Sequence, residues 1–216
     1  MSERILGAVI GVHADDTGLI MPPEIAPVQV VIVPIYNKKN ADTVKKAASA
    51  LKDVLAESGI RVELDTREGM RPGAKFFDWE IKGVPVRLEL GGRDLENGTV
   101  AFARRDNGEK GAIDVGSVAP GVKLLLKAVA SDMYAKAEQD RKAHVVEFDT
   151  LEGLESMPEG KILKFGWCGD EKCGHTFEDK YGLKILGTPY IPEEWAGKCA
   201  ICGKEGAKPA YAARSL

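Results

Sequence analysis

The four cysteines of this 216-residue chain all lie in its last quarter and form two close pairs. Four residues separate Cys168 from Cys173, two separate Cys199 from Cys202, and 25 residues lie between the pairs. Two short turns that each direct two thiolates at one point suit the tetrahedral coordination of zinc. Four thiolates leave no position for a water molecule. The spacing therefore predicts a structural zinc site rather than a catalytic one.

Two disulfides or a redox-active dithiol are the alternatives for the same cysteines. Disulfides need an oxidising compartment, and the chain shows neither a charged-then-apolar signal segment nor a long apolar run. A redox Cys-x-x-Cys lies at the start of a helix, whereas Cys202 is followed by the sequence GKEG. Gly203 is typical of a zinc knuckle because it lets backbone amides turn toward the sulfurs. His144 and His175 are expected to face solvent or to lie behind the ligands.

Size and composition indicate one ordinary domain with a small appended one. Hydrophobic residues make up 44% of the chain and charged residues 29%, which is typical of a globular protein without membrane spans. The formal net charge of −3 argues against indiscriminate binding to nucleic acid. Between Arg67 and Arg105, however, eight basic residues stand against six acidic ones, which leaves room for a local basic patch.

Strand and helix patterns alternate from residue 28 to residue 142. Residues 28–35 are almost entirely apolar, as a strand covered on both faces must be. Residues 84–90 alternate, with Arg87 and Glu89 on one face. The resulting mixed sheet with helices packed on it predicts an α/β fold. The predicted elements are strand 28–35, helix 40–58 with a buried stripe of Val44, Ala47, Ala48, Leu51, Val54 and Leu55, strand 60–64, helix 71–83, strands 84–90 and 98–105, and helix 120–142.

Three parts are predicted along the chain. Residues 5–12 are apolar at helix-compatible spacing and resemble a buried segment, and the prolines that follow make an extended connector. A boundary near residue 25 separates this part from an α/β domain over residues 26–143. Residues 144–216 form a small glycine-rich α+β domain, whose core we expect to be too small to be stable without zinc.

Four separated stretches carry a family resemblance. They are residues 2–4 (SER) with 13–19 (HADDTGL), residues 22–35 (PPEIAPVQVVIVPI), residues 71–94 (RPGAKFFDWEIKGVPVRLELGGRD), and the two cysteine pairs. In this order they resemble the end of class II motif 3, the entry into the anticodon-binding domain, the body of that domain and an extra C-terminal zinc domain. The whole resembles the C-terminal half of archaeal or eukaryotic-type prolyl-tRNA synthetases, which are class II aminoacyl-tRNA ligases.

The resemblance implies the anticodon-binding fold of class II synthetases, a mixed five-stranded sheet flanked by helices, with a small zinc-binding α+β domain after it. It also implies the part of a cytoplasmic proline–tRNA ligase that binds tRNA(Pro), with neither DNA nor a membrane as a partner. The full-length enzyme uses ATP and Mg²⁺ and forms a homodimer. Motifs 1 and 2 are not among these residues, so this chain alone is expected to be inactive. Arg4 is similar to the motif 3 arginine, which can stack on the adenine of ATP.

Anticodon recognition requires bases that are stacked on flat side chains and hydrogen-bonded at their edges, while lysine and arginine hold phosphates. Proline anticodons share two guanines, whose Watson–Crick edge suits the carboxylate of Glu89 and whose O6 and N7 suit an arginine. Core packing of Phe76 and an ion pair between Arg87 and Glu89 are the structural alternatives. The resemblance places the tRNA contacts on the sheet and the neighbouring helix, with the candidates Lys75, Phe76, Arg87, Glu89, Arg93, Arg104 and Arg105.

Two other functions are consistent with the same residues. The chain could be a free-standing RNA-binding or accessory protein that reuses the anticodon-binding fold, or an interaction module whose zinc domain docks on a partner protein. The motif 3 residues favour the ligase, because an independent accessory protein has little reason to keep them. Threonyl- or histidyl-tRNA synthetases share the α/β domain but lack the four-cysteine appendage.

Overall fold

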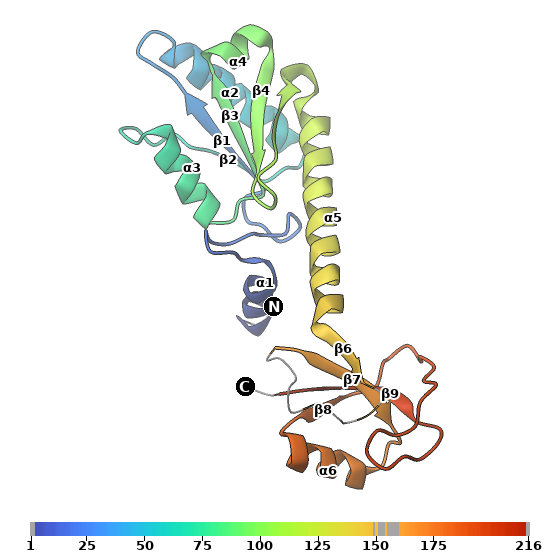
Figure 1. Ribbon diagram of the computed structural model, residues 1–216. Coiled ribbons are helices and arrows are strands. Elements are labelled where there is room, and N and C mark those ends of the chain that lie inside the picture. Colours follow the sequence, from blue (N-terminus) through green and yellow to red (C-terminus); the bar gives the residue numbers. More distant parts are fainter. Residues whose placement is uncertain (1–2, 149, 151–153, 155–159, 215–216) are drawn as a thin grey trace. The chain divides into compact units, whose positions relative to one another are not determined.

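The computed structural model describes residues 3–148, 150, 154 and 160–214 (Figure 1). The chain divides between Ala137 and Glu138 into two compact units, and each is described by itself. The long helix α5 (Val118–His144) begins in the first unit and ends in the second. Because this helix continues without a break to His144, we keep 26–143 and 144–216 as the proposed domains.

The first unit is built on a five-stranded sheet in the order β2-β1-β3-β4-β5. β1 pairs in parallel with β2 and β3, whereas β4 is antiparallel to both β3 and β5. This mixed sheet, flanked by helices, confirms the predicted fold class. The strands are β1 (Val30–Ile35), β2 (Val62–Leu64), β3 (Val86–Gly91), β4 (Thr99–Arg104) and β5 (Lys110–Asp114).

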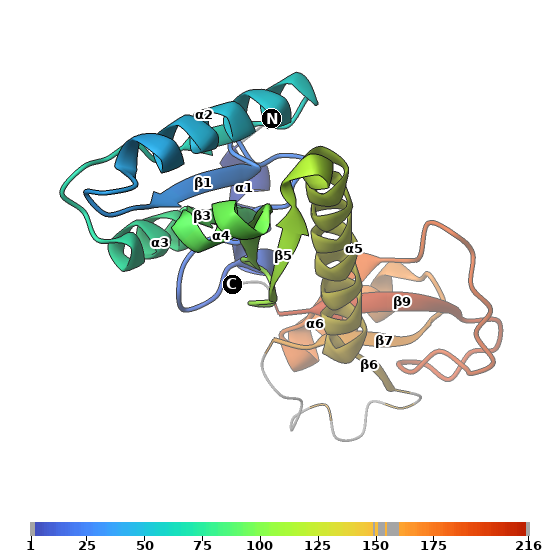
Figure 2. The same ribbon diagram turned by 90° about the horizontal axis from the view of Figure 1, so that it is seen from above.

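Helices cover the two faces of this sheet unequally. α2 and α5 pack on one face, whose core contains Ile32 and Leu88, and α3 packs on the other face against Val31 and Val33. Figure 2 shows α2 and α3 on opposite sides of β1. A strand buried on both faces has no polar side, which explains the uniformly apolar sequence of β1. The helices of this unit are α1 (Glu3–His13), α2 (Ala41–Glu57), α3 (Pro72–Ile81), α4 (Gly92–Asn97) and the first part of α5, which a short 3-10 turn (Val115–Ser117) precedes.

The structure differs from the sequence-based prediction at four places in this unit. Neither α4 nor β5 is predicted, because α4 has only six residues and β5 (KGAID) is a largely exposed edge strand without apolar alternation. Residues 5–12 form α1, but none of the helix is buried. The prediction that Val54 is buried is wrong: it is 45% exposed, whereas Leu55 beside it is fully buried. Each residue turns a helix by about 100°, so the buried stripe includes only one of these two.

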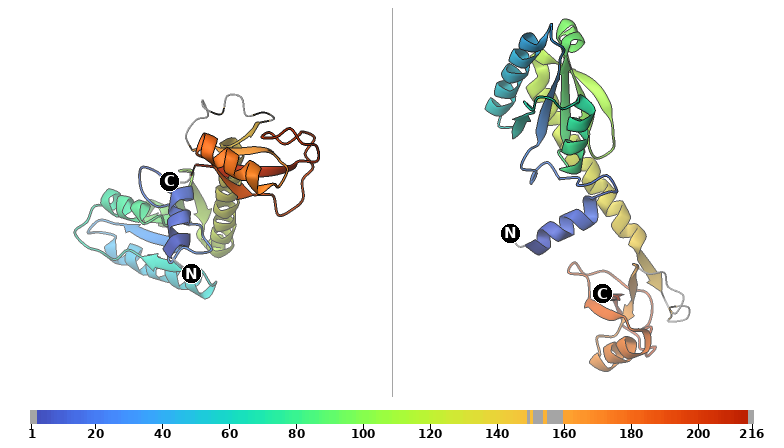
Figure 3. Two further views of the ribbon diagram at one scale, coloured as in Figure 1. Left: turned by 90° about the horizontal axis from the view of Figure 1, so that it is seen from below. Right: turned by 90° about the vertical axis from the view of Figure 1, so that its left-hand side faces the viewer.

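The second unit contains a four-stranded sheet in the order β6-β7-β9-β8, in which only β6 and β7 are parallel. α6 (Glu171–Tyr181) packs on it, and the rings of Phe165 and Phe177 stack with centroids 4.8 Å apart. Figure 3 shows this helix along one face of the sheet in two further views. The buried hydrophobic cluster is small, as the sequence predicts. The strands are β6 (Val145–Phe148), β7 (Ile162–Trp167), β8 (Lys184–Gly187) and β9 (Lys208–Ala213).

Among the residues described, no helix has both the length and the apolar character needed to cross a membrane.

Candidate RNA-binding face and metal centre

The four cysteines come together at one end of the second sheet. Cys168 follows β7 directly, Cys173 lies in the first turn of α6, and Cys199 and Cys202 lie in the loop before β9. The four sulfur atoms all lie within 4.8 Å of one another, and the Sγ atoms of Cys168 and Cys202 are 3.9 Å apart. Tetrahedral zinc with Zn–S bonds of about 2.3 Å separates its sulfur ligands by about 3.8 Å. The donor set and its spacing therefore fit a zinc ion.

Glycines shape the turns that carry these thiols. Gly169 follows Cys168 with φ of 82°, and Gly203 follows Cys202 with φ of 72°, values that residues with a side chain rarely adopt. In the second turn, the amide of Gly203 donates to the carbonyl of Cys199 at 2.8 Å, and the amide of Cys199 donates to the carbonyl of Lys204 at 2.9 Å. This tight, glycine-closed turn is the knuckle that the sequence predicts.

Backbone amides also set the charge of the buried thiol. Burial raises the pKa of Cys199, but hydrogen bonds to its sulfur from the amides of Cys202, Ile201 and Cys168 outweigh this and lower the pKa to about 7. Burial and the neighbouring thiols raise the pKa of Cys173 instead. One thiolate is thus stabilised by the protein alone, whereas four adjacent thiolates need a cation.

The alternatives for the cysteines find no support in the geometry. All four are free thiols. Cys199, the first cysteine of the Cys-x-x-Cys pair, lies in a loop rather than at the start of a helix. His144 and His175 are exposed and lie outside the cysteine cluster, as predicted.

A stacked and charged cluster lies on the face of the first sheet that α3 partly covers. The guanidinium of Arg87 lies over the ring of Phe76, 4.0 Å from its centroid. The same guanidinium donates to Glu89 at 3.0 Å and to Glu80 at 2.6 Å. Arg87 and Glu89 are thus on one strand face, as the alternation predicts, and α3 adds Phe76 and Glu80. Glu80 lies on α3 and Arg87 on β3, so no single strand or helix period links the two, and the sequence prediction missed Glu80.

The part of this face beyond α3 carries small side chains. Glu89 of β3 pairs with Ala101 of β4, which pairs with Ala112 of β5, so the three residues form a row across the sheet. Ala101 is half-buried and Ala112 is exposed. Directly beside the Phe76–Arg87 stack, the sheet therefore carries two small side chains that are at least partly exposed. We call the row Glu89, Ala101 and Ala112 the open face.

Lys75 lies in a separate network that anchors α3. Its side chain is buried and its Nζ atom lies 3.3 Å from the carboxylate of Asp65 at the end of β2. Arg67 and the indole of Trp79 also donate to Asp65, at 2.6 and 2.8 Å. Burial alone raises the pKa of Asp65, but these hydrogen bonds outweigh it and hold the pKa well below the ordinary value. The network fixes the helix that carries Phe76 and Glu80.

Arg104 and Arg105 lie where β4 ends, and Nε of Arg105 donates to the backbone carbonyl of Glu80 at 3.0 Å. Arg104 is almost fully buried and donates to Asp106, Glu109 and Asp132 at 2.6 to 2.9 Å. The hydrogen bonds that Arg104 donates to Asp106 and Asp132 raise its pKa above the ordinary value, against the opposite effect of burial. Arg105 donates to both carboxylate oxygens of Asp15.

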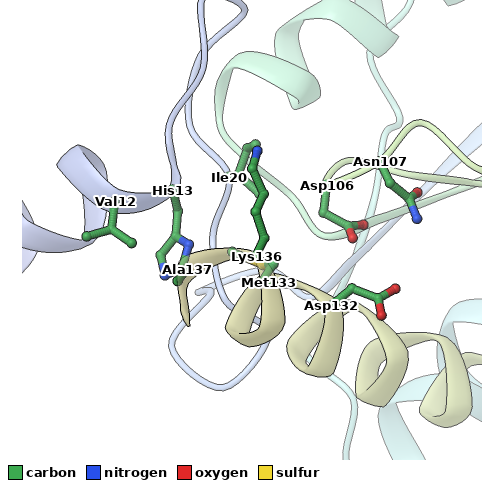
Figure 4. Close-up of a pocket in the computed structure, with 9 residues that line it drawn as sticks. All are labelled: Val12, His13, Ile20, Asp106, Asn107, Asp132, Met133, Lys136 and Ala137. Carbon is green, nitrogen blue, oxygen red and sulfur yellow. The ribbon is translucent and has the colours of Figure 1, made fainter. Parts of the chain in front are cut away.

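A cavity of about 240 Å³ adjoins the Arg104 cluster (Figure 4). Asp106 and Asp132 line it together with apolar side chains such as Ile20 and Met133. His13 lies at the other side of the cavity, where burial and the positive charge of Lys136 lower its pKa. Both carboxylates are already bound to Arg104, so the cavity is bordered by a structural ion cluster.

Two arginines that the sequence analysis names as site residues are exposed. Arg93 lies in α4 beside a groove that Tyr36, Asn37 and Asn40 also line, at the carboxyl ends of β1 and β3. Arg4 lies on the exposed helix α1. Of the predicted RNA contacts, the fold thus brings Phe76, Arg87 and Glu89 together and joins Arg105 to them through the backbone of Glu80. Lys75, Arg93 and Arg104 lie at separate positions. Their roles toward RNA stay predictions.

Comparison with known protein families matches both units. Residues 29–124 match the family described as anticodon binding domain, and residues 152–216 match the family described as prolyl-tRNA synthetase, C-terminal. The first match defines the class, a nucleic-acid recognition domain on a mixed α/β sheet. The second match is to the C-terminal domain of prolyl-tRNA synthetases, so both units resemble parts that occur in aminoacyl-tRNA synthetases.

Relatives extend this resemblance along the whole chain. The proline–tRNA ligase of Methanosarcina mazei is 42% identical over 216 residues, which is all of this chain and 45% of that protein. The proline–tRNA ligases of Pyrococcus abyssi and Methanoregula boonei are 44% and 45% identical, each over 95% of this chain and 44% of the relative. The chain therefore spans less than half the length of the curated relatives it matches.

Proposed function

We propose that this chain binds the anticodon loop of tRNA(Pro) on the open face of its first unit. The observation that carries the proposal is the Arg87–Phe76 stack, flanked by Glu80 and Glu89 and continuous with Ala101 and Ala112. Unpaired bases stack on aromatic and guanidinium planes, and carboxylates accept hydrogen bonds from the N1 and N2 groups of guanine. Two carboxylates beside one stack suit the two guanines that proline anticodons share.

Arg87→Lys tests the proposal without removing the charge. Lysine cannot hold two carboxylates with a planar fork or stack on Phe76, so we expect the affinity for a tRNA(Pro) transcript to fall about tenfold. Filter binding at moderate salt measures this, with Lys123→Ala as the control because Lys123 is exposed on α5, the helix that packs on the other face. Equal affinities of the parent and Arg87→Lys contradict the assignment. Equal affinity of the parent for tRNA(Pro) and a non-cognate tRNA favours a general RNA-binding protein instead.

We further propose that the four cysteines hold a structural zinc ion. The support is the spacing of their sulfur atoms, the two glycine turns and the amide hydrogen bonds to Cys199. The ion neutralises thiolates that the protein alone does not stabilise. No open position for a substrate follows from this donor set, so the role of the zinc is to stabilise the second unit.

Ligation of proline to tRNA is proposed for a protein that contains this chain together with the rest of a ligase. The relatives are named proline–tRNA ligase, and the chain spans about 45% of their length. In that protein Arg4 contacts ATP, Mg²⁺ accompanies the ATP, and two copies form a homodimer in the cytoplasm. The 216 residues alone are proposed to be inactive, which an assay of proline-dependent ATP–pyrophosphate exchange measures directly.

A further inference from the structure

One face of β7 ends at the metal centre and carries an unusual series of contacts. Lys164, Gly166 and Cys168 alternate along the strand and its exit, so they point to the same side, opposite the buried Leu163 and Phe165. Among the described residues, β6 pairs with β7 as far as Phe148 opposite Phe165. One residue further along β7, the carbonyl of Gly166 bonds to another segment.

The segment before the second cysteine pair lies beside β7. Nζ of Lys164 is 2.8 Å from the carboxylate of Glu193. Two residues further along β7, the carbonyl of Gly166 accepts a hydrogen bond from the amide of Ala200 at 2.9 Å. Both contacts bring residues 193–200 toward Cys168, and Cys199 is part of that segment.

Gly166 permits this approach because it has no side chain. A Cβ atom there would lie 2.3 Å from Nε1 of Trp195 and 2.5 Å from the carbonyl oxygen of Lys198, distances that no carbon atom tolerates. Gly166 does not have a positive φ, so its conformation does not require glycine. The close packing of Trp195 and Lys198 requires it instead.

The indole of Trp195 supports the same conclusion. Its Nε1 atom is buried and has no hydrogen-bond partner among the residues described here. A Cβ atom on Gly197 would lie 2.7 Å from the same nitrogen, so the ring edge fits between two glycines. Leaving a buried N–H without an acceptor is unfavourable, and the ring occupies this position nonetheless.

We propose that Gly166 is the positioning residue of the metal centre: residues 193–200 dock on it through Trp195, and this docking sets the separation of the two cysteine pairs as the unit folds around the ion. The inference depends on the zinc site proposed above. The inference goes beyond the zinc proposal in one respect: packing on β7, and not the ion alone, brings the two cysteine pairs together.

Gly166→Ala in the 216-residue chain tests this inference. Competition with a chromogenic chelator gives the Zn²⁺ affinity, and saturating Co²⁺ reports the ligand geometry through its thiolate charge-transfer and d–d absorption. We expect Gly166→Ala to bind Zn²⁺ at least about tenfold more weakly and to lose Co²⁺ absorption intensity at saturation. Gly174→Ala is the matched control, because a Cβ atom there makes ordinary contacts of 3.6 and 3.8 Å.

Parent-like affinity and absorption in Gly166→Ala overturn the inference, and so does a loss of thermal stability with unchanged Co²⁺ absorption. If Gly166→Ala does not fold, Trp195→Ala adds no bulk and is expected to weaken Zn²⁺ binding in the same direction; an unchanged affinity of Trp195→Ala then overturns it. A parent chain that gives no thiolate–Co²⁺ absorption refutes the zinc site itself, which distinguishes the two failures.

Discussion

Arg87 and Arg104 are both arginines on neighbouring strands, with side chains only 9% and 4% exposed. Arg104 donates to three carboxylates, whereas Arg87 donates to two and turns one flat side of its guanidinium to Phe76. The sequence treats the two residues alike, as basic side chains near a predicted RNA surface. Only the partners of the two side chains show that Arg87 is a stacked group beside the open face and that Arg104 is the centre of an ion cluster.

Loss of the Asp65 carboxylate is expected to destabilise the first unit. Its carboxylate is fully buried and is shared by Lys75, Arg67 and Trp79. Asp65→Asn leaves the buried Lys75 without its charge partner, so we expect a loss of about 3 kcal/mol in the free energy of unfolding at pH 7. Urea denaturation followed by circular dichroism measures it. Glu68→Gln, which removes the exposed partner of Lys45, serves as the control and is expected to leave stability unchanged.

The same substitution has a defined pH dependence. The pKa of Asp65 in the folded state lies below its ordinary value of 3.8, so the stabilisation is complete above about pH 4 and is lost as the pH falls below that value. The difference in stability between the parent and Asp65→Asn should therefore shrink below pH 4. A difference that stays constant from pH 7 to pH 3 contradicts this account.

At the scale of single elements, the sequence pattern predicts the longer strands better than it predicts the short elements. The alternation of residues 84–90 correctly predicts that Arg87 and Glu89 share a face, because side chains on a strand repeat every two residues. The same period identifies β1 as buried on both faces. α4 and β5 have too few apolar residues to give a periodic signal, and the position of β5 follows from its pairing with β4.

The open face makes a prediction for β4. Ala101→Glu places a long negative side chain beside Glu89, where the proposed anticodon bases lie, and we expect tRNA(Pro) affinity to fall at least about tenfold through steric exclusion and repulsion of phosphates. Leu124→Glu adds the same charge at a position on α5 that is 70% exposed and lies outside the open face. The control should bind tRNA nearly as the parent does. Equal losses in both variants would show that net charge rather than the open face decides binding.

At the scale of the whole molecule, the two units depend on different sources of stability. The first unit has a large hydrophobic core between its sheet and helices, whereas the second has a small one. Structural zinc contributes about 10 to 16 kcal/mol of apparent binding free energy in small sites. Removal of the ion is therefore expected to unfold the second unit and to leave the first one folded.

Chelation of the purified chain tests this expectation. Amide NMR spectra should lose the dispersed signals of residues 160–214 and keep those of the first sheet, while the affinity for an isolated anticodon stem-loop stays unchanged. Replacing the metal should restore the spectrum. A second unit that stays folded with no bound metal would refute the structural role of the ion.

The sequence by itself determined the α/β class, the strand faces and the two cysteine pairs, because each depends on local periodicity or on short spacings along the chain, and its resemblance to a known family added the expected function. The tertiary structure alone decided which of the predicted RNA contacts meet, added Glu80 to them, and placed Gly166 against Trp195. These contacts join residues from different elements, and their geometry depends on how the elements pack. No local pattern in the chain records that packing.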